Sequence, residues 1–239
     1  MINIQSADFQ AGTVLLIDKP LLWTSFDAVN KLRHAIRRRI GTKNIKVGHA
    51  GTLDPMATGL LIICTGKFTK DIDSYQSQEK EYTGTFCIGA TRPSHDMETE
   101  INEIFDTQHI TDKSIHEVCK SFIGEQSQMP PIYSAIKKDG EPIYKAARRG
   151  EEVEVKPRQV NILKFEITKI EMPVLHFRVK CSKGTYIRSL AYDFGKRLES
   201  GAYLATLRRT KIGNFNVDNA MSIEYFIQEV NPAEELNSF

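Results

Sequence analysis

The residues best suited to chemistry lie in one short stretch, Gly48–Gly59, with the sequence Gly-His-Ala-Gly-Thr-Leu-Asp-Pro-Met-Ala-Thr-Gly. Its three glycines allow a tight, backbone-exposed loop that holds a histidine and a carboxylate. Pro55 biases Asp54 toward an extended backbone, and apolar Leu53 and Met56 flank the carboxylate. We predict that Asp54 is partly desolvated and reactive. A purely structural role in a turn or a helix cap is the alternative.

Other kinds of reactive site lack the residues that they need. The chain contains no Gly-x-x-x-x-Gly-Lys-Ser/Thr phosphate loop and no Gly-x-Ser-x-Gly nucleophile turn. Its six histidines form no close ligand pairs, and Asp71-Ile72-Asp73 lacks the rest of a calcium loop. These absences argue against a nucleoside triphosphate site and a metal site, and a carboxylate is the best candidate nucleophile.

The composition is typical of a globular protein, with 41% hydrophobic and 26% charged residues among 239. Because no apolar run approaches the roughly 18 residues of a membrane span, and residues 1–10 lack signal-peptide features, we expect a soluble, cytoplasmic protein. Four widely spaced cysteines favour buried thiols. A net charge of +2 does not decide whether nucleic acid is a partner.

The elements on either side of the loop are expected to anchor it. Residues 13–19 predict a buried strand that ends at Pro20. Thr24 or Ser25 then caps a helix that ends at Gly41. The inner face of this helix is expected to comprise Phe26, Val29, Leu32 and Ile36. After the loop, residues 59–66 form a short apolar run bracketed by glycines, which predicts a central strand.

In the rest of the chain, strands lie in runs and outnumber helices. Alternating apolar residues predict strands over residues 80–90, 160–170 and 174–181. Helices are expected between Thr111 and Gly124, from about residue 185, and over residues 222–230. The expected fold class is α+β, with a mixed, mainly antiparallel central sheet flanked by helices. With no repeat or linker, we expect one domain over residues 1–239, with a short tail from about residue 218.

Positive charge gathers in two places. The helix before the loop carries Arg37 among several cations. A basic excursion over about residues 126–160 is predicted to contain a hairpin at Asp139-Gly140 and a short helix. Its cations include Lys137, Lys145, Arg148 and Arg149. An ordinary solvated face is the alternative for the cluster on the helix.

The Gly48–Gly59 stretch resembles the catalytic motif of the tRNA pseudouridine synthase B (TruB) family. Further segments that resemble family motifs lie on both sides of this stretch, in the family's order, and together they span most of the chain. They are Leu15–Pro20, Lys80–Tyr82, Pro130–Lys137 and Cys181–Arg188. In the loop after Tyr82, Pro93 stands where relatives commonly have an acid, and Asp96 matches the second acid. Longer family members carry a further RNA-binding domain of the PUA type, and we expect this chain to be a short form without it.

The resemblance implies a pseudouridine-synthase catalytic domain that isomerises a uridine at position 55, in the T arm of tRNA, without a cofactor. Asp54 matches the nucleophile, while attack on the sugar and attack on the base both stay open. Arg188 matches the arginine that pairs with it, and Tyr82 matches the tyrosine that stacks on the base. The remaining substrate-binding positions are His49, Tyr186, Leu207, Lys19 and Pro20. The basic excursion matches the RNA-clamping insertion, so its cations, together with Arg37, are candidate contacts to the RNA backbone. A monomer is expected.

Two other classes of function stay open. One is a tRNA-binding or tRNA-folding protein whose benefit does not depend on Asp54, since the basic residues lie elsewhere in the sequence. The other is a sugar-processing enzyme with Asp54 as nucleophile, which usually requires a second acid that the sequence does not identify.

Overall fold

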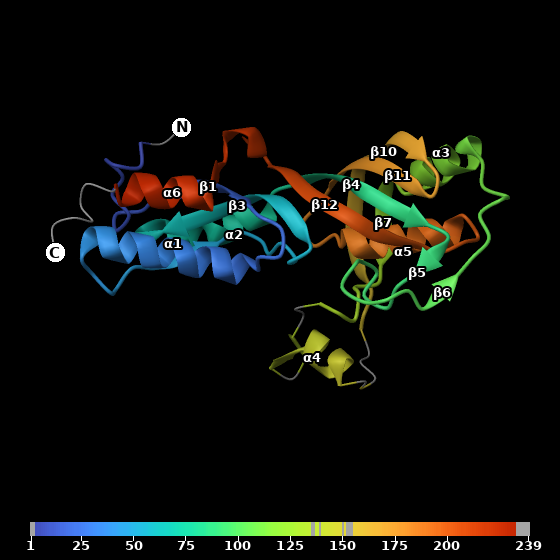
Figure 1. The fold of residues 1–239 in the computed structure, drawn as a ribbon, viewed down its shortest axis with the longest axis horizontal. Helices are drawn as coiled ribbons and strands as arrows, with labels where there is room; N and C mark the ends of the chain where they lie inside the picture. The colour runs from blue at the N-terminus through green and yellow to red at the C-terminus, as the bar shows by residue number, and fades with distance from the viewer. Residues whose placement is uncertain (1–2, 135–136, 139, 150, 152–154, 233–239) are drawn as a thin grey trace. The chain divides into compact units, whose positions relative to one another are not determined.

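The computed structural model describes residues 3–134, 137–138, 140–149, 151 and 155–232. They form an α+β fold with a mixed sheet and flanking helices, as the sequence predicts (Figure 1). The chain divides into two compact units. Unit 1 comprises Met1–Glu81 with Arg208–Phe239, and unit 2 comprises Tyr82–Leu207. Strands β4 (Lys80–Ile88) and β12 (Ala202–Ile212) contribute residues to both units, and the expectation of one domain stays a prediction.

The sheet of unit 1 has the strand order β14-β1-β3-β12, with β2 paired to β3 and β13 paired to β12. Strand β1 (Val14–Lys19) is antiparallel to β3 (Ala57–Thr65) and parallel to β14 (Met221–Ser222), which makes the sheet mixed. The other elements of the unit are α1 (Ser25–Ile40), β2 (Val47–His49), η1 (Gly66–Asp71), α2 (Ile72–Ser77), β13 (Phe215–Asn216), η2 (Val217–Asn219) and α6 (Ile223–Val230).

Helices α1 and α6 lie side by side in unit 1 and share one apolar core (Figure 1). Thr24 and Asp27 form a capping box at the start of α1, and Gly41 ends the helix at φ 65°. The expectation for Phe26 is wrong, since its side chain is 64% exposed. The buried stripe of α1 begins at Ser25, and the next residue lies roughly 100° around the helix.

Residues 221–230, which follow the predicted start of the tail, belong to this core. Strand β14 pairs with β1, and α6 buries Ile223, Phe226 and Val230 almost completely. Their rows of apolar side chains face α1 and the sheet. What the sequence marks as a tail is therefore part of the packing of unit 1.

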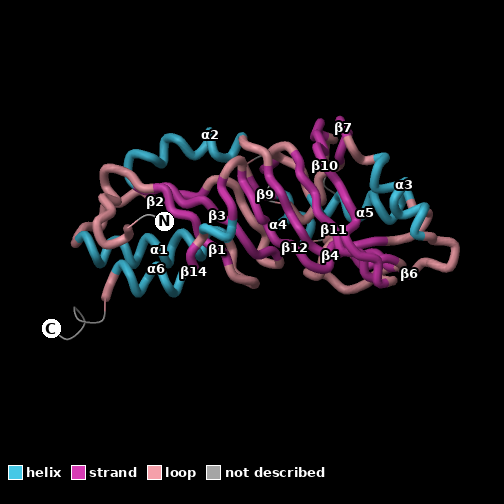
Figure 2. Tube along the Cα trace, turned by 90° about the horizontal axis from the view of Figure 1, so that it is seen from above, coloured by secondary structure: helices cyan, strands magenta, loops and turns pink. Residues whose placement is uncertain are grey.

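The sheet of unit 2 has the strand order β12-β4-β11-β10-β7, with helices α3 (Asp112–Ser121) and α5 (Ile187–Arg197) beside it (Figure 2). Its long strands β10 (Arg158–Glu171) and β11 (Val174–Cys181) form an antiparallel pair. The shorter elements are β5 (Ala90–Thr91), β6 (Glu103–Ile104), β7 (Gly124–Gln128), β8 (Lys137–Lys138), β9 (Glu141–Pro142) and α4 (Ile143–Arg148).

A cluster of phenylalanine rings forms the core of unit 2. Phe86 of β4 stacks on Phe177 of β11 with ring centroids 4.3 Å apart, and Phe194 of α5 lies 5.6 Å from Phe86. Thr111 caps α3 as predicted, but Gly124 begins β7 instead of closing the helix. Phe194 joins α5 to this aromatic cluster, so the helix is packed firmly against the sheet.

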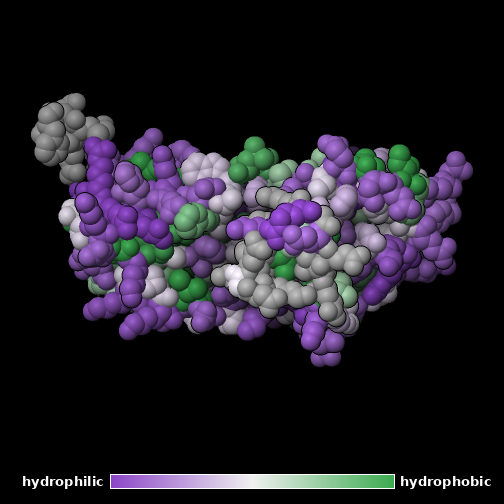
Figure 3. Space-filling view, turned by 90° about the horizontal axis from the view of Figure 1, so that it is seen from below, coloured by the Kyte–Doolittle hydropathy of each residue, from purple (hydrophilic) through white to green (hydrophobic). Residues whose placement is uncertain are grey.

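The surface seen in Figure 3 is mostly hydrophilic. Within the described part of the chain, no helix combines the length and the apolar character needed to cross a bilayer. The four cysteines form no disulfide. Burial raises the pKa of Cys64 to about 11 and that of Cys119 to about 12, so these thiols stay protonated at neutral pH.

Candidate active site

The loop that carries Asp54 joins two antiparallel neighbours, β2 and β3, in unit 1. Its backbone is tied back at both ends, since Ala50 N donates to Ile62 O at 2.9 Å and Ala57 N donates to Asp54 O at 3.0 Å. Asp54 itself is half-buried. The strand predicted on the far side of the loop is therefore confirmed as β3, and its pairing with β2 fixes both ends of the loop.

The start of α1 and the turn before it hold the residues on either side of Asp54. The hydroxyl of Ser25 accepts from Leu53 N at 2.8 Å and donates to Leu53 O at 3.1 Å. On the other side, Leu22 N donates to Pro55 O at 2.8 Å. With the Leu53 side chain only 3% exposed, the carboxylate is held between two fixed neighbours. From the sequence alone, only a capping role is expected for Ser25.

Arg209 of β12 supports the same loop from the core. Its side chain is 1% exposed. Nε donates to Leu60 O at 2.8 Å, while the two terminal nitrogens donate to Gly51 O at 3.1 Å and Thr52 O at 3.4 Å. Gly59 has φ +105°, and a Cβ there would lie 2.3 Å from Arg209 O, so only glycine fits beside this strand. Nothing in the sequence marks Arg209 as part of the site, because arginine is usually exposed in proteins.

Lys19 and Pro20 lie where β1 ends. The side chain of Lys19 is 0% exposed, and Nζ donates to Pro20 O at 2.9 Å and Trp23 O at 2.6 Å. Burial lowers the pKa of Lys19 to about 8, and the negative charge of Asp54 opposes this shift. Lys19 is therefore a buried cation within electrostatic reach of Asp54. This placement favours a supporting role, and contact of Lys19 with substrate stays a prediction.

His49 lies at the end of β2, half-buried. Burial, and then the positive charge of Arg209, lower the pKa of its imidazole below the usual value, so His49 is neutral at pH 7. Its buried Nδ1 makes no hydrogen bond within the part of the chain that the structure describes. A buried polar atom of this kind is suited to a hydrogen bond from a ligand.

The other predicted residues belong to unit 2. Tyr82 on β4 is 8% exposed, Leu207 on β12 is half-buried, and Tyr186 is the N-cap residue of α5. Arg188 in the first turn of α5 is 4% exposed. Its Nη1 donates to Tyr133 O at 2.9 Å and to Ser94 O at 3.4 Å. The structure thus brings Tyr186 and Arg188 together on one helix start.

Asp96 supplies a carboxylate beside Arg188. Its Oδ2 lies 3.6 Å from Arg188 Nε, and each of the two side chains is 5% exposed. Glu98 N donates to Oδ1 of Asp96 at 2.9 Å, which orients the carboxylate. The neighbouring Pro93 is exposed. The loop whose role the sequence leaves open therefore holds Arg188 in a defined position.

The predicted contacts to an RNA backbone are spread over several elements. Arg37 lies exposed in the last turn of α1. Lys145 of α4 is also exposed, and Arg149 forms an ion pair with Glu151 at 2.6 Å. Lys137 lies on β8 and Arg148 on α4, but their side chains fall outside what the structure describes.

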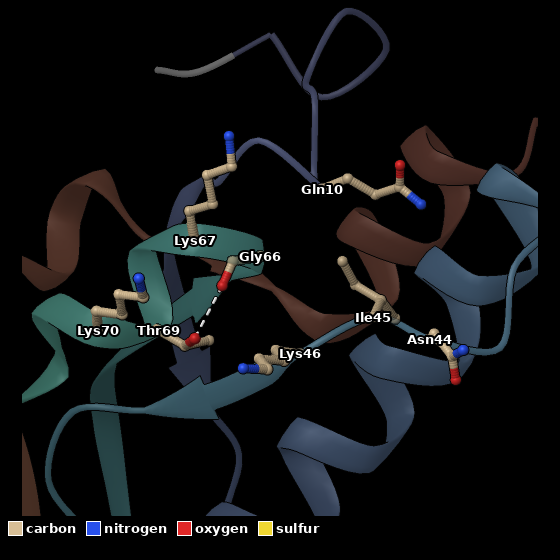
Figure 4. A pocket seen from close by; sticks show the side chains of 8 residues that line it. All are labelled: Gln10, Asn44, Ile45, Lys46, Gly66, Lys67, Thr69 and Lys70. Carbon is tan, nitrogen blue, oxygen red and sulfur yellow. Dashed lines mark hydrogen bonds between the residues drawn. The ribbon is translucent and has the colours of Figure 1, made fainter.

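One recess in unit 1 is separate from the Asp54 loop. Its volume is about 290 Å³, and its lining includes Lys46, Lys67 and Lys70 (Figure 4). Figure 4 shows Lys46 pointing toward Thr69, whereas Lys67 and Lys70 point out of the recess. Because the three ammonium groups do not converge, the recess lacks the geometry of a single anion site. Among the described residues, no group of three or more His, Cys, Asp or Glu is arranged to hold a metal.

Comparison with known proteins places this architecture in a family. The family model described as TruB family pseudouridylate synthase (N terminal domain) matches residues 37–187. The chain is 60% identical to tRNA pseudouridine synthase B of Flavobacterium johnsoniae, over 92% of this chain and 96% of the relative. It is 52% identical to the protein of that name in Parabacteroides distasonis, over 91% of this chain and 92% of the relative.

A solved structure agrees with these sequence relatives. The crystal structure of a Cbf5-Nop10-Gar1 complex matches 95% of this chain at a TM-score of 0.67 and 26% identity. The present chain spans 59% of the length of that protein. With the sequence matches, this likeness establishes that the chain belongs to the TruB family of pseudouridylate synthases and is an isomerase of the tRNA pseudouridine synthase class.

Proposed function

We propose that this protein converts uridine to pseudouridine at position 55, in the T arm of tRNA, with Asp54 as the nucleophile. The observation that carries the proposal is the hydrogen bonding of the loop around Asp54: Leu53 is bonded to Ser25 at the start of α1, and Pro55 is bonded to Leu22 in the turn before that helix. A carboxylate held in this way keeps its orientation when it forms and releases an adduct. Lys19 adds a buried positive charge to the environment of Asp54.

The reaction is an isomerisation that balances without a further reactant. The bond between N1 and C1′ breaks, and a bond between C5 and C1′ forms. C5 loses its proton, and N1 gains one. Asp54 attacks either the ribose or the base and leaves again at the end. No electron is transferred to or from the substrate, so a carboxylate and groups that move protons are sufficient chemistry.

The other predicted residues receive their roles from the family resemblance. Arg188 is the cation that pairs with Asp54, and its burial beside the carbonyl groups of Tyr133 and Ser94 gives it a fixed direction. Tyr82 stacks on the uracil ring. The substrate-binding positions are Tyr186, Leu207, His49, Lys19 and Pro20, with a backbone contact to uracil expected at Leu207.

The target base must leave its stack before it reaches Asp54. We infer that neutral His49 binds near the nucleotides displaced in this step, because its buried Nδ1 offers a hydrogen-bonding atom. Phosphate contacts then hold the T arm, and their candidates are Arg37, Lys137, Lys145, Arg148 and Arg149. The protein is expected to act as a monomer in the cytoplasm, without a metal or a cofactor.

The test is a map of pseudouridine in tRNA from cells with and without this gene. We expect loss of pseudouridine at position 55 alone, and its return when the gene is restored. A T-arm transcript with cytidine at position 55 provides the matched control for the purified protein. Persistence of the modification at position 55 in the deletion strain would contradict the proposal.

A second role in tRNA folding is compatible with the same surface. Lys145 and Arg149 are exposed and lie on an insertion that does not include Asp54. RNA binding by these residues can therefore act without the chemical step. Refolding of a misfolded tRNA by the Asp54→Asn protein would support this role, and failure of that protein to speed refolding would exclude it.

A further inference from the structure

The two ends of the basic insertion join neighbouring strands of unit 2, at two residues that lie opposite each other in the sheet. Strand β7 ends at Gln128, and β10 starts at Arg158. These two residues are register partners in the antiparallel pair of β7 and β10. The insertion therefore leaves the sheet directly after Gln128 and returns to it at Arg158. Both ends of the RNA-clamping segment have a fixed base in the sheet.

The side chain of Gln128 binds the backbone of Tyr186 at two points. Its Nε2 donates to Tyr186 O at 3.0 Å, and its Oε1 accepts from Tyr186 N at 2.8 Å. Only one orientation of the amide makes both bonds. Gln128 is 4% exposed, so solvent does not compete for them. Tyr186 precedes α5 directly, which means that the amide fixes the start of that helix.

The residues after Gln128 are bound to the same helix start. Ser189 Oγ donates to Met129 O at 2.7 Å, and Arg188 Nη1 donates to Tyr133 O at 2.9 Å. At the returning end of the insertion, the guanidinium of Arg158 lies over the ring of Tyr186, 5.1 Å from its centroid. The base of the insertion thus contacts three neighbouring residues of the α5 start, at positions 186, 188 and 189.

We propose that Gln128 is a positioning residue that couples the RNA-clamping insertion to Tyr186 and Arg188. RNA held by the insertion then also fixes the base-binding tyrosine and the arginine in their reactive positions. The inference rests on the proposed function, because it assumes that these two residues act on the uridine. It assigns to Gln128 a contribution to the rate of the chemical step, not to RNA affinity.

The decisive variant is Gln128→Met, which keeps the length of the side chain and removes both hydrogen bonds. At saturating tRNA transcript, we expect the single-turnover rate constant to fall by between about 10-fold and about 100-fold, as for a small misplacement of catalytic groups. The Kd for RNA should change less than about threefold. The control is Gln126→Met, on the same strand, whose side chain binds Arg197 and Ser121 instead. Gln126→Met should keep the wild-type rate constant.

A second variant separates positioning from general loss of structure. Gln128→Glu accepts from Tyr186 N but, as a carboxylate, cannot donate to Tyr186 O. Burial raises the pKa of such a carboxyl group, and its protonated form regains an O–H donor. We therefore expect the rate of Gln128→Glu relative to wild type to rise as the pH falls from 8 to 6. A ratio that does not change with pH would overturn the proposal.

The outcomes distinguish this inference from the proposed function. If the wild-type protein forms no pseudouridine in the T arm, the proposed function fails. If the wild type is active and Gln128→Met keeps its rate constant, only the positioning role fails. If Gln128→Met weakens RNA binding and keeps the rate at saturation, the coupling is wrong and Gln128 belongs to the binding surface.

Discussion

Replacing Arg209 by methionine tests whether a buried guanidinium holds the Asp54 loop. The change removes three donors, to Leu60 O, Gly51 O and Thr52 O, and keeps an apolar stem of similar length. Two of these hydrogen bonds are short, at 2.8 and 3.1 Å, while the third is long, at 3.4 Å. The carbonyl of Leu60 loses its guanidinium donor in a fully buried environment.

The magnitude follows from these bonds. A hydrogen bond from a charged donor contributes about 1.5–3 kcal/mol, and a buried carbonyl that loses its donor adds a desolvation cost. We therefore expect Arg209→Met to lower the free energy of unfolding by about 3–5 kcal/mol. The rate of the folded enzyme should also fall, because the loop backbone at Gly51 and Thr52 loses its support. The loss of activity should therefore exceed what the smaller fraction of folded protein explains.

The adjacent arginine provides a matched control. Arg208 pairs with Asp18 at 2.6 Å, but the two side chains are 41% and 34% exposed. Solvent screening limits such a pair to about 1 kcal/mol or less. Denaturant unfolding of Arg209→Met and Arg208→Met measures how far each change lowers the free energy of unfolding, provided that the two m-values are equal. If Arg209→Met lowers the free energy of unfolding no more than Arg208→Met does, Arg209 does not hold the Asp54 loop.

Three further predictions use other features of the chain. Leu22 has φ 67° and is 70% exposed, so Leu22→Gly relieves backbone strain and should not lower the free energy of unfolding. A loss of about 1 kcal/mol, as is usual when glycine replaces a residue within a helix, would contradict this expectation. Burial lowers the pKa of Lys19 from 10.5 to about 8, so between these pH values the unfolded chain binds more protons and stability rises with pH. The free energy of unfolding of the wild type, relative to that of Lys19→Met, should therefore rise by up to about 3 kcal/mol between pH 8 and pH 10.5. A difference between the two proteins that stays constant over this pH range would contradict the lowered pKa of Lys19. Replacing Lys145 or Arg37 by glutamine should reduce the slope of log Kd against log salt by about 0.7–0.9 for each lost phosphate contact, and an unchanged slope removes that residue from the RNA surface.

The parts of the fold that follow local patterns could be predicted from the sequence. The helix capped at Thr24 and ended at Gly41 is one example, since both signals are short-range. The strand bracketed by Gly59 and Gly66 is another, and together they locate the Asp54 loop. Phe26 was misplaced, because a residue at the first turn lies close to the boundary of the apolar stripe.

Features that depend on partners far away in the sequence could not be predicted. Strand β12 supplies Arg209 to a loop more than a hundred residues earlier, and nothing local marks this arginine as buried. Gln128 and Tyr186 are also distant in sequence, and a glutamine at a strand end has many ordinary uses. Likewise, β14 and α6 follow what looks like a polar boundary, but their apolar side chains complete the core of unit 1.

The most direct test of the central claim is the single-turnover rate of the Asp54→Asn variant on a tRNA transcript with uridine at position 55. The amide of asparagine has the same shape as the aspartate carboxylate but cannot act as a nucleophile in its place. Asp73→Asn, at an exposed position of α2 in the same unit, is the matched control. We predict that Asp54→Asn loses at least about 10⁴-fold in rate while its Kd for RNA changes less than about threefold. Pseudouridine formation by Asp54→Asn at near the wild-type rate would contradict the assignment of Asp54 as the nucleophile.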